Sequence, residues 1–213
     1  MNKNVMKSAA FVLAASAIFF STGCGGEAGS GTATPKKKLS VAVEASYAPF
    51  EYKDEDGHII GFDVDLMKAV AQKMDAEAEF NNLPFEQIFH FVGDKKIQLG
   101  ISAIGATEER KKHVSFSDPY YSLGSYVILV RPGTEGIHGP KDLKGKIVAA
   151  ERGTTNEMKV KELSPARTVM PDYYKDVFKA VEEGEADAAI MDEPGATSVS
   201  YTHLRAHETR RHL

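Results

Sequence analysis

The sequence predicts an α/β fold with parallel sheets, and two observations carry that prediction. Short apolar runs that favour strands alternate along the chain with stretches of helical period, which is typical of parallel sheets. Three of these runs also end in an acid, namely Glu44, Glu151 and Asp192. Ligands of open α/β sheets bind beyond the carboxyl ends of strands, so we expect a binding site there.

Composition narrows the class of protein. The 213 residues are 42% hydrophobic and 26% charged, with a net charge of −4, which is ordinary for a soluble protein of one or two domains. An acidic chain argues against nucleic-acid binding. His90 and His113 have no acidic or cysteine neighbours at ligand spacing, so we expect no metal and no cofactor.

The first residues precede the fold. Two lysines and an apolar run over 9–20 have the layout of a secretory signal peptide and are too short to span a bilayer. Cys24, the only cysteine, follows this run. Either residues 1–24 are a lipoprotein signal peptide and Cys24 is lipidated, or cleavage nearby leaves a free thiol. We favour lipidation, because an exposed thiol outside the cell is a liability.

Residues 25–38 are mostly Gly, Ser, Thr and Ala and end in three lysines. Such a segment cannot bury apolar surface, so it predicts a flexible tether. A tether after a lipidated cysteine would let the folded part reach a membrane partner.

Residues 39–130 carry the first group of elements. Alternating Leu39, Val41 and Val43 predict a strand, and Asp54-Glu55-Asp56-Gly57 predicts a hairpin turn. Helices are expected from Asp63 and from Pro84. Further apolar runs predict buried strands at 97–101 and 126–130. The helix after Asp63 should bury a stripe of Leu66, Met67, Val70, Ala71 and Met74.

The stretch 102–110 has the chemistry of a carboxylate receptor. Its small residues let a ligand approach the backbone closely. Thr107 is a good N-cap for a short charged turn, and it places free N–H groups beside Arg110. Helix-end donors and one planar cation together suit a carboxylate.

A second group of elements begins after the Gly, His and Pro residues that follow position 130. Strands are expected at 146–150 and 169–170 and a buried strand at 186–191, with helices from Gly153-Thr154-Thr155 and over 174–183. This alternation again predicts a parallel sheet.

The stretch from Ser102 to Arg110, followed by Phe116-Ser117-Asp118-Pro119-Tyr120-Tyr121, resembles a family motif. So do Tyr47-Ala48-Pro49-Phe50-Glu51, Gly61-Phe62-Asp63-Val64-Asp65-Leu66, Asp142-Leu143-Lys144-Gly145-Lys146, Gly153-Thr154-Thr155 and Asp192-Glu193-Pro194. Together they resemble the polar-amino-acid branch of the extracytoplasmic solute-binding proteins that feed ABC importers. The resemblance implies a two-lobed type II periplasmic-binding-protein fold, with lobe 1 and a hinge strand at 39–130 and lobe 2 at 131–197.

The resemblance also implies that the second lobe is incomplete. Family members continue well beyond Gly195, whereas residues 198–213 are rich in His and Arg and show no apolar period. This string resembles translated adaptor sequence, so we expect a tail that is not native and a natural chain that continues from about Thr197.

The resemblance assigns roles around a free amino acid. Arg110, the N–H groups near Thr107, Thr154 and Thr155 would bind its carboxylate, and Asp192 its ammonium group. Ala103 and Gly105 depart from the family pattern, and Gly105 lacks the usual hydroxyl. The expected ligand-binding residues are Glu44, Tyr47, Phe85, Ala103, Gly105, Thr107, Arg110, Glu151, Thr154, Thr155 and Asp192. For Phe85 a role in the core alone is the competing interpretation.

The expected function is extracytoplasmic binding of an amino acid and its delivery to the transmembrane subunits of an ABC importer, by a lipid-anchored monomer that is not an enzyme. Two acids and two aromatic rings near the side chain favour a cationic ligand. A glutamine-binding member is the alternative. A dehydratase-type enzyme on the same fold and a receptor sensor domain are weaker rivals, because the sequence offers no nucleophile, cofactor loop or membrane span beyond the signal segment.

Overall fold

The computed structural model describes residues 36–163, 165–202 and 210–212. The predicted signal peptide, Cys24 and most of the predicted tether lie outside these residues. Residues 36–213 form one compact unit. The first strand begins at Lys37, so the last lysines of the predicted tether belong to it. No helix in the described part of the chain is long and apolar enough to cross a membrane.

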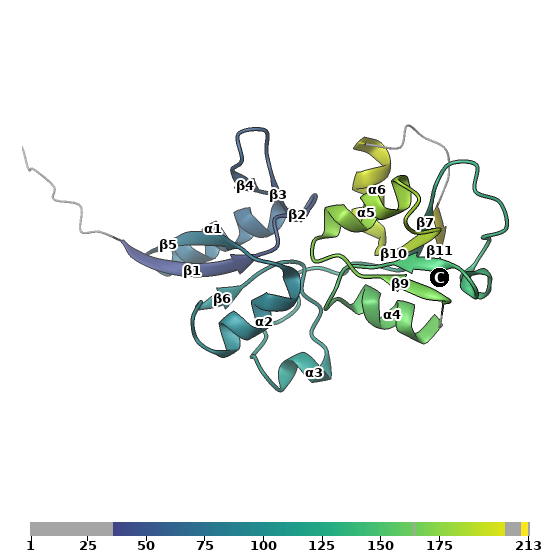
Figure 1. The fold of residues 1–213 in the computed structure, drawn as a ribbon. Helices are drawn as coiled ribbons and strands as arrows, with labels where there is room; N and C mark the ends of the chain where they lie inside the picture. Colours follow the sequence, from purple (N-terminus) through teal and green to yellow (C-terminus); the bar gives the residue numbers. More distant parts are fainter. Residues whose placement is uncertain (1–35, 164, 203–209, 213) are drawn as a thin grey trace, which may run out of the picture. The chain divides into compact units, whose positions relative to one another are not determined.

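The first sheet is parallel and has β1 (Lys37–Val43) between β5 (Ala76–Asn82) and β6 (Leu99–Gly100) (Figure 1). Helices α1 (Phe62–Lys73) and α2 (Phe85–Gly93) cover its two faces. Side chains alternate along a strand, so Val41 and Val43 pack with α1, whereas Ala42 packs with α2. The strand and both helices are as the sequence predicts.

The apolar stripe expected on α1 is partly wrong. Val70 and Met74 are 41% and 55% exposed, whereas Asp63 and Val64 are fully buried with Met67 and Ala71. A three-stranded sheet covers only a narrow face of a helix. The buried face of α1 therefore lies closer to Asp63 than the expected stripe does. The strand expected at 97–101 is also shorter: β6 has two exposed residues, although Ile97 and Ile101 on either side are buried.

A small antiparallel sheet of β2 (Ser46–Tyr47), β3 (Glu51–Lys53) and β4 (Ile59–Ile60) follows β1 and confirms the predicted hairpin. Farther along the chain, α3 (Glu108–Lys111) is the short charged turn that Thr107 caps. These elements flank the carboxyl end of β1.

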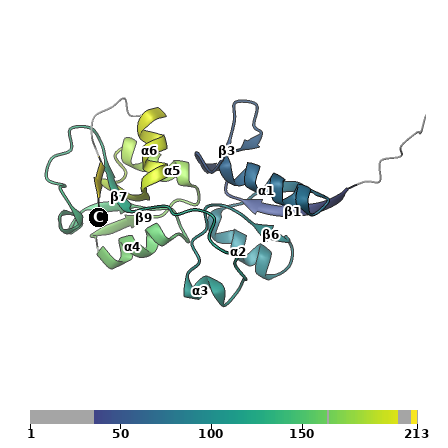
Figure 2. The ribbon, with the colours of Figure 1, turned by 180° about the vertical axis from the view of Figure 1, so that it is seen from behind.

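The second sheet has the order β11-β7-β10-β8-β9. Its strands β10 and β9 run parallel to β8, as predicted, but β7 is antiparallel to β10. Helices α4 and α5 cover opposite faces, because Ala188 and Ile190 pack with Val160 of α4 and Met191 packs with Val177 of α5 (Figure 2). The chain thus forms two successive sheets, each covered by helices, which confirms the two-lobed α/β fold. The elements are β7 (Tyr126–Val130), the 3₁₀ helix η1 (Pro140–Leu143), β8 (Ile147–Ala149), α4 (Thr155–Leu163), β9 (Arg167–Val169), α5 (Tyr174–Glu182), β10 (Ala188–Asp192), α6 (Glu193–Thr202) and β11 (Arg210–His212).

Two features bear on the expected boundaries. Strand β7, which we assigned to the first lobe as a hinge, pairs with β10 in the second sheet. Within the expected foreign tail, α6 runs on to Thr202, and β11 pairs with the other edge of β7. The division of the chain at 130 and at 197 stays a prediction.

Candidate functional site

A cavity of about 30 Å³ lies where the carboxyl ends of β1, β8 and β10 meet. Ten of the eleven residues expected from the sequence line it, and Thr107 is the exception. Five more residues complete the lining. The predicted members are Glu44, Tyr47, Phe85, Ala103, Gly105, Arg110, Glu151, Thr154, Thr155 and Asp192, and the additional ones are Glu51, Ser102, Leu123, Asn156 and Tyr174.

Arg110 joins the two halves of the site. Its Nη1 donates to the Gly105 carbonyl at 2.7 Å, and its Nη2 donates to the Gly153 carbonyl, on the far side of the cavity, at 2.9 Å. The guanidinium lies over the rings of Phe85 and Phe89, at 5.1 Å and 4.6 Å from their centroids. Burial lowers the pKa of Arg110 to about 10, so it stays charged at neutral pH.

Thr107 holds Arg110 from behind. Its hydroxyl oxygen accepts a hydrogen bond from the Arg110 backbone N–H at 3.2 Å, as expected of an N-cap. Its side chain therefore orients the start of α3.

Glu44 and Glu151 bring negative charge to the cavity from β1 and β8. They are 1% and 5% exposed. Burial raises the pKa of Glu44 to about 7, although the Ser46 hydroxyl donates to its Oε1 at 2.6 Å. Burial, and then the charge on Glu44, raise the pKa of Glu151 well above its usual value. A cation between these carboxyls would relieve both effects.

Asp192 lies at the end of β10, as predicted, and Asn156 donates an N–H to its Oδ2 at 3.0 Å. Burial raises the pKa of Asp192, while the hydrogen bond from Asn156 and the charge on Arg110 oppose that rise. Thr154 accepts from the Glu157 N–H and donates to the Glu151 carbonyl, so it caps α4. The backbone N–H groups at the start of α4 therefore lie close to the cavity.

Tyr47 and Tyr174 form an aromatic wall, with ring centroids 4.4 Å apart. Gly195 makes this packing possible, since a Cβ there would lie 2.0 Å from the Tyr174 hydroxyl oxygen and 2.3 Å from the Tyr47 ring. Both hydroxyl groups are buried without a hydrogen-bond partner. Such groups are costly unless a ligand or water satisfies them.

Gly153 marks the close contact between the halves. It has φ +75°, and a Cβ would lie 2.8 Å from the Glu86 Cβ of α2. Only glycine fits this backbone conformation and this spacing without strain.

The residues that the sequence analysis missed differ in how they could have been found. Asn156 directly follows Thr155 at the start of α4, so a helix-end argument includes it. Glu51 belongs to a quoted motif, but no pattern indicated that it is 0% exposed. Ser102 begins the stretch 102–110 that the sequence analysis singled out, although it was not named as a ligand-binding residue. Tyr174 and Leu123 carry no sequence signal for a position at the cavity.

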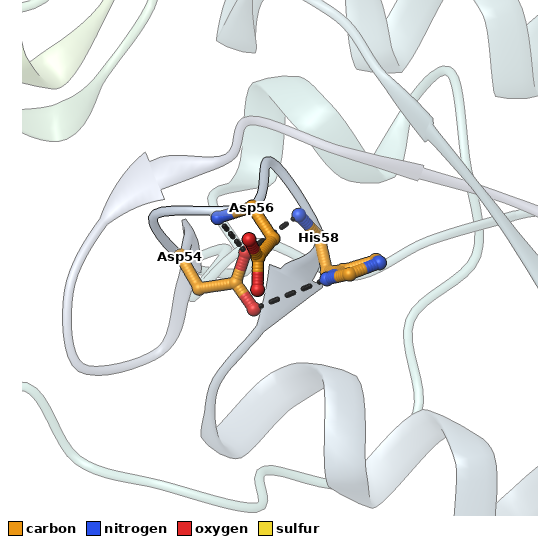
Figure 3. Close-up of side chains that lie close together, drawn as sticks. All are labelled: Asp54, Asp56 and His58. Atoms are coloured by element: carbon orange, nitrogen blue, oxygen red, sulfur yellow. Dashed lines mark hydrogen bonds and ion pairs between the residues drawn. The ribbon is translucent and has the colours of Figure 1, made fainter.

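Outside the cavity, Asp54, Asp56 and His58 lie together at the tip of the β3–β4 hairpin (Figure 3). The Asp54 oxygens already accept from the backbone N–H groups of Asp56 and His58 and from His58 Nδ1 at 3.3 Å. These bonds account for the hairpin turn. The expectation that His113 has no acidic neighbour is wrong, because Oε1 of Glu109 in α3 lies 3.8 Å from its Nε2.

Comparisons with known proteins agree with the geometry. The sequence profile of the family described as "Bacterial extracellular solute-binding proteins, family 3" matches residues 39–190. An arginine-binding extracellular protein of Bacillus subtilis is 37% identical over 88% of this chain and 74% of its own. An ABC transporter arginine-binding protein of Escherichia coli is 35% identical over 75% of this chain and 65% of its own. This chain thus spans 65–74% of the length of these two relatives.

Solved structures give the same picture. An ancestral arginine-binding protein bound to arginine superposes with a TM-score of 0.77, at 33% identity, over 84% of this chain and 80% of its own. Its structure bound to glutamine also gives 0.77, at 34% identity over 84% and 79%. An ancestral amino acid-binding protein, described as a precursor of cyclohexadienyl dehydratase, gives 0.72 at 34% identity over 77% and 74%.

Proposed function

Since this chain belongs to the bacterial extracellular solute-binding proteins of family 3, we propose that it binds a free cationic amino acid between its lobes and delivers it to an ABC importer. Two of its relatives are named as arginine-binding proteins. The ligand's carboxylate would approach Arg110 and the start of α4, and its ammonium group would approach Asp192.

One observation carries the preference for a cationic side chain. Glu151 Oε1 is buried at the cavity and has no hydrogen-bond partner, and the same is true of the Tyr47 and Tyr174 hydroxyl groups. With Glu44 opposite, these acceptors surround a space that favours N–H donors with positive charge. A guanidinium or ammonium group supplies such donors, whereas an acidic side chain adds repulsion.

The cavity as it stands holds about two water molecules, given roughly 10–15 Å³ for each. An amino acid does not fit into it. We therefore propose that the lobes separate to admit the ligand and close on it, with the hydrogen bond from Arg110 to Gly153 exchanged for one to the ligand carboxylate.

Titration calorimetry of the full chain against the twenty amino acids and ornithine tests the proposal. We expect heat of binding from arginine, lysine, ornithine or histidine, and weaker or no binding of glutamine and glutamate. If glutamine or glutamate binds more tightly than every cationic amino acid, the cationic assignment is wrong.

Glutamine is the second candidate within the same class. The structure of the ancestral arginine-binding protein bound to glutamine supports it. In that case Glu44, whose Oε1 accepts from the Ser46 hydroxyl, would accept the ligand amide with its other oxygen. Glu151 would be protonated.

An enzymatic role is the weaker alternative, supported by the ancestral precursor of a dehydratase. An enzyme would use Glu44 or Glu151 as a general acid or base. We propose binding without turnover, and incubation of the protein with arogenate-like or prephenate-like substrates, followed by product analysis, tests it.

We also propose lipidation at Cys24 and a monomer tethered to the extracytoplasmic side of the membrane by residues 25–36, since β1 begins at Lys37. Metabolic labelling with a fatty-acid analogue tests the anchor, with Cys24→Ser as the control. Sequencing the gene across the codon for Thr197 tests whether residues 198–213 are native.

A further inference from the structure

Two buried carboxyl groups, one of which lines the cavity, lie within hydrogen-bonding reach of each other. Glu51 is in β3 and Asp63 is in the first turn of α1, and both are 0% exposed. One oxygen of each is hydrogen-bonded. Glu51 Oε1 accepts from the Ser102 hydroxyl at 2.8 Å. Asp63 Oδ2 accepts from the Ala103 N–H at 2.7 Å and from the Tyr120 hydroxyl at 2.8 Å.

The other two oxygens, Glu51 Oε2 and Asp63 Oδ1, are buried and have no partner. Ionised carboxylates only accept hydrogen bonds, so two of them cannot satisfy each other, and burying their like charges together is costly. A proton on either group turns it into a donor. One O–H···O hydrogen bond then gives both of these oxygens a partner.

The groups around Glu51 favour its protonated form. The titratable groups that face Glu51 are Asp63, Glu44, Tyr47 and Tyr120. Each of them is neutral or negative. Burial, and then the charge on Asp63, raise the pKa of Glu51 well above its usual value.

We propose that Glu51 and Asp63 share one proton in the folded protein and are positioning residues for the ligand cavity. The second half of this inference rests on the proposed function, because it assumes that the amino acid binds in the cavity. The first half concerns the protonation of the free protein and does not need a ligand.

The pair positions two residues of the cavity wall. Ser102 donates to Glu51 and accepts from the Glu44 N–H at 3.0 Å, so the pair is connected to the strand end that presents Glu44. Ala103 has φ +46°, a conformation that costs a non-glycine residue free energy. The hydrogen bond from its N–H to Asp63 stabilises this conformation, which sets the direction of the Ala103 carbonyl.

The pH dependence of stability tests the shared proton. A raised pKa in the folded state contributes stability that is present at low pH and is lost as pH rises toward that pKa. Glu51→Gln removes this titration and keeps an N–H donor for Asp63. Measured by denaturant unfolding of the full chain from pH 5 to 9, the stability of Glu51→Gln relative to the parent should increase with pH. The ratio of the two unfolding constants should change by up to about tenfold per pH unit.

The exposed Glu77→Gln on β5 is the matched control, and it should follow the parent at every pH. Because Glu44, Glu151 and Asp192 are present in all three proteins, the part of their titration that does not depend on Glu51 cancels in the comparison. A Glu51→Gln protein that also follows the parent from pH 5 to 9 would overturn the shared proton.

Infrared difference spectroscopy gives a second test that does not depend on unfolding. Burial raises the pKa values of Glu44 and Glu151 as well, so these acids give carbonyl bands that the parent and the variants have in common. The parent at neutral pH should show one further carbonyl stretch of a protonated carboxylic acid, and this band should be absent from Glu51→Gln. It should also be absent from Asp63→Asn, where the amide donates to an ionised Glu51. If the parent has no carbonyl band that disappears in both Glu51→Gln and Asp63→Asn, the proposal is wrong.

The positioning role has its own readout. Glu51→Ala should weaken arginine binding, and Glu51→Gln should recover most of the loss. Equal loss in the two variants would overturn the positioning role. If the parent binds no amino acid at all, the proposed function and the positioning role both fail, while the stability and infrared measurements still decide the shared proton.

Discussion

Glu44 and Glu151 occupy similar places in the two lobes, each just beyond the carboxyl end of an interior parallel strand, yet their hydrogen bonds differ. Glu44 follows β1 and accepts from the Ser46 hydroxyl at 2.6 Å. Glu151 follows β8, and its Oε1 is buried without a partner. The first lobe thus satisfies its acid internally, whereas the second lobe leaves an acceptor for the ligand. The same topology supplies both carboxyls, and the neighbouring side chains give them different tasks.

Arg110 is where the two lobes meet, so removing it should have the largest effect. We expect Arg110→Ala to weaken amino-acid binding by about 2–5 kcal/mol, the cost of truncating one partner of a buried charge pair. Lysine should rescue poorly, because it lacks the planar fork that reaches Gly105 and Gly153 together.

Arg152→Ala is the control for this variant. Arg152 lies on the surface and pairs with Asp172, so its loss should change affinity by no more than about 0.5 kcal/mol. Calorimetry on both variants checks the contrast. A loss below about 1.4 kcal/mol in Arg110→Ala would place Arg110 outside the binding site.

The two acids themselves give the next contrast. Glu151→Gln should weaken arginine binding by about 1–3 kcal/mol, because it removes a charged acceptor that has no other partner. Glu44→Gln should cost less, since Ser46 already satisfies part of that carboxyl. Affinities for arginine and for glutamine, measured on both variants, check the order. A larger loss in Glu44→Gln would reverse the tasks that we assign to the two lobes.

The positions of the two acids could be predicted from the sequence, but their hydrogen bonds could not. Strand ends in an α/β sheet indicated Glu44, Glu151 and Asp192 without any structure, and capping chemistry indicated Thr107 and Arg110. These rules depend on local sequence.

Those hydrogen bonds depend on contacts between distant segments. The contacts of Glu151 and Asp192 are decided by Tyr174 and Asn156, respectively, which belong to separate helices. The same limit explains the error on α1, where Asp63 is buried and Met74 is 55% exposed. Helical period predicts an apolar stripe on α1. Which side of that stripe is buried depends on the width of the sheet and on the Ala103 N–H and Tyr120 hydroxyl, which donate to Asp63.

The pH dependence of binding sharpens the comparison further. Burial raises the pKa of Glu44 to about 7 in the free protein, and a cationic ligand favours its ionised form. Affinity for arginine should therefore be highest above pH 7 and fall as pH decreases through 7, by at most about tenfold per pH unit for this one group.

Calorimetry from pH 5 to 8 measures the slope, and Glu44→Gln should remove the part of it that comes from Glu44. Arginine keeps its side-chain charge throughout this range, so ligand titration does not contribute. An affinity that is constant from pH 5 to 8 would show that the ligand does not interact with ionised Glu44.

The smallest expected effect concerns Thr107, the one predicted site residue that does not line the cavity. Its hydroxyl oxygen accepts the Arg110 N–H, and α3 has only four residues, so the cap fixes the start of the whole helix. Thr107→Ala should lower the free energy of unfolding by about 1 kcal/mol, and Thr107→Ser, which keeps the acceptor, should be close to the parent. Affinity should fall much less than in Arg110→Ala, because the carbonyls of Gly105 and Gly153 and two phenylalanine rings still hold the guanidinium. If Thr107→Ala loses as much affinity as Arg110→Ala, the Thr107 hydroxyl contacts the ligand itself, and the first lobe contributes more to the carboxylate site than its cap alone.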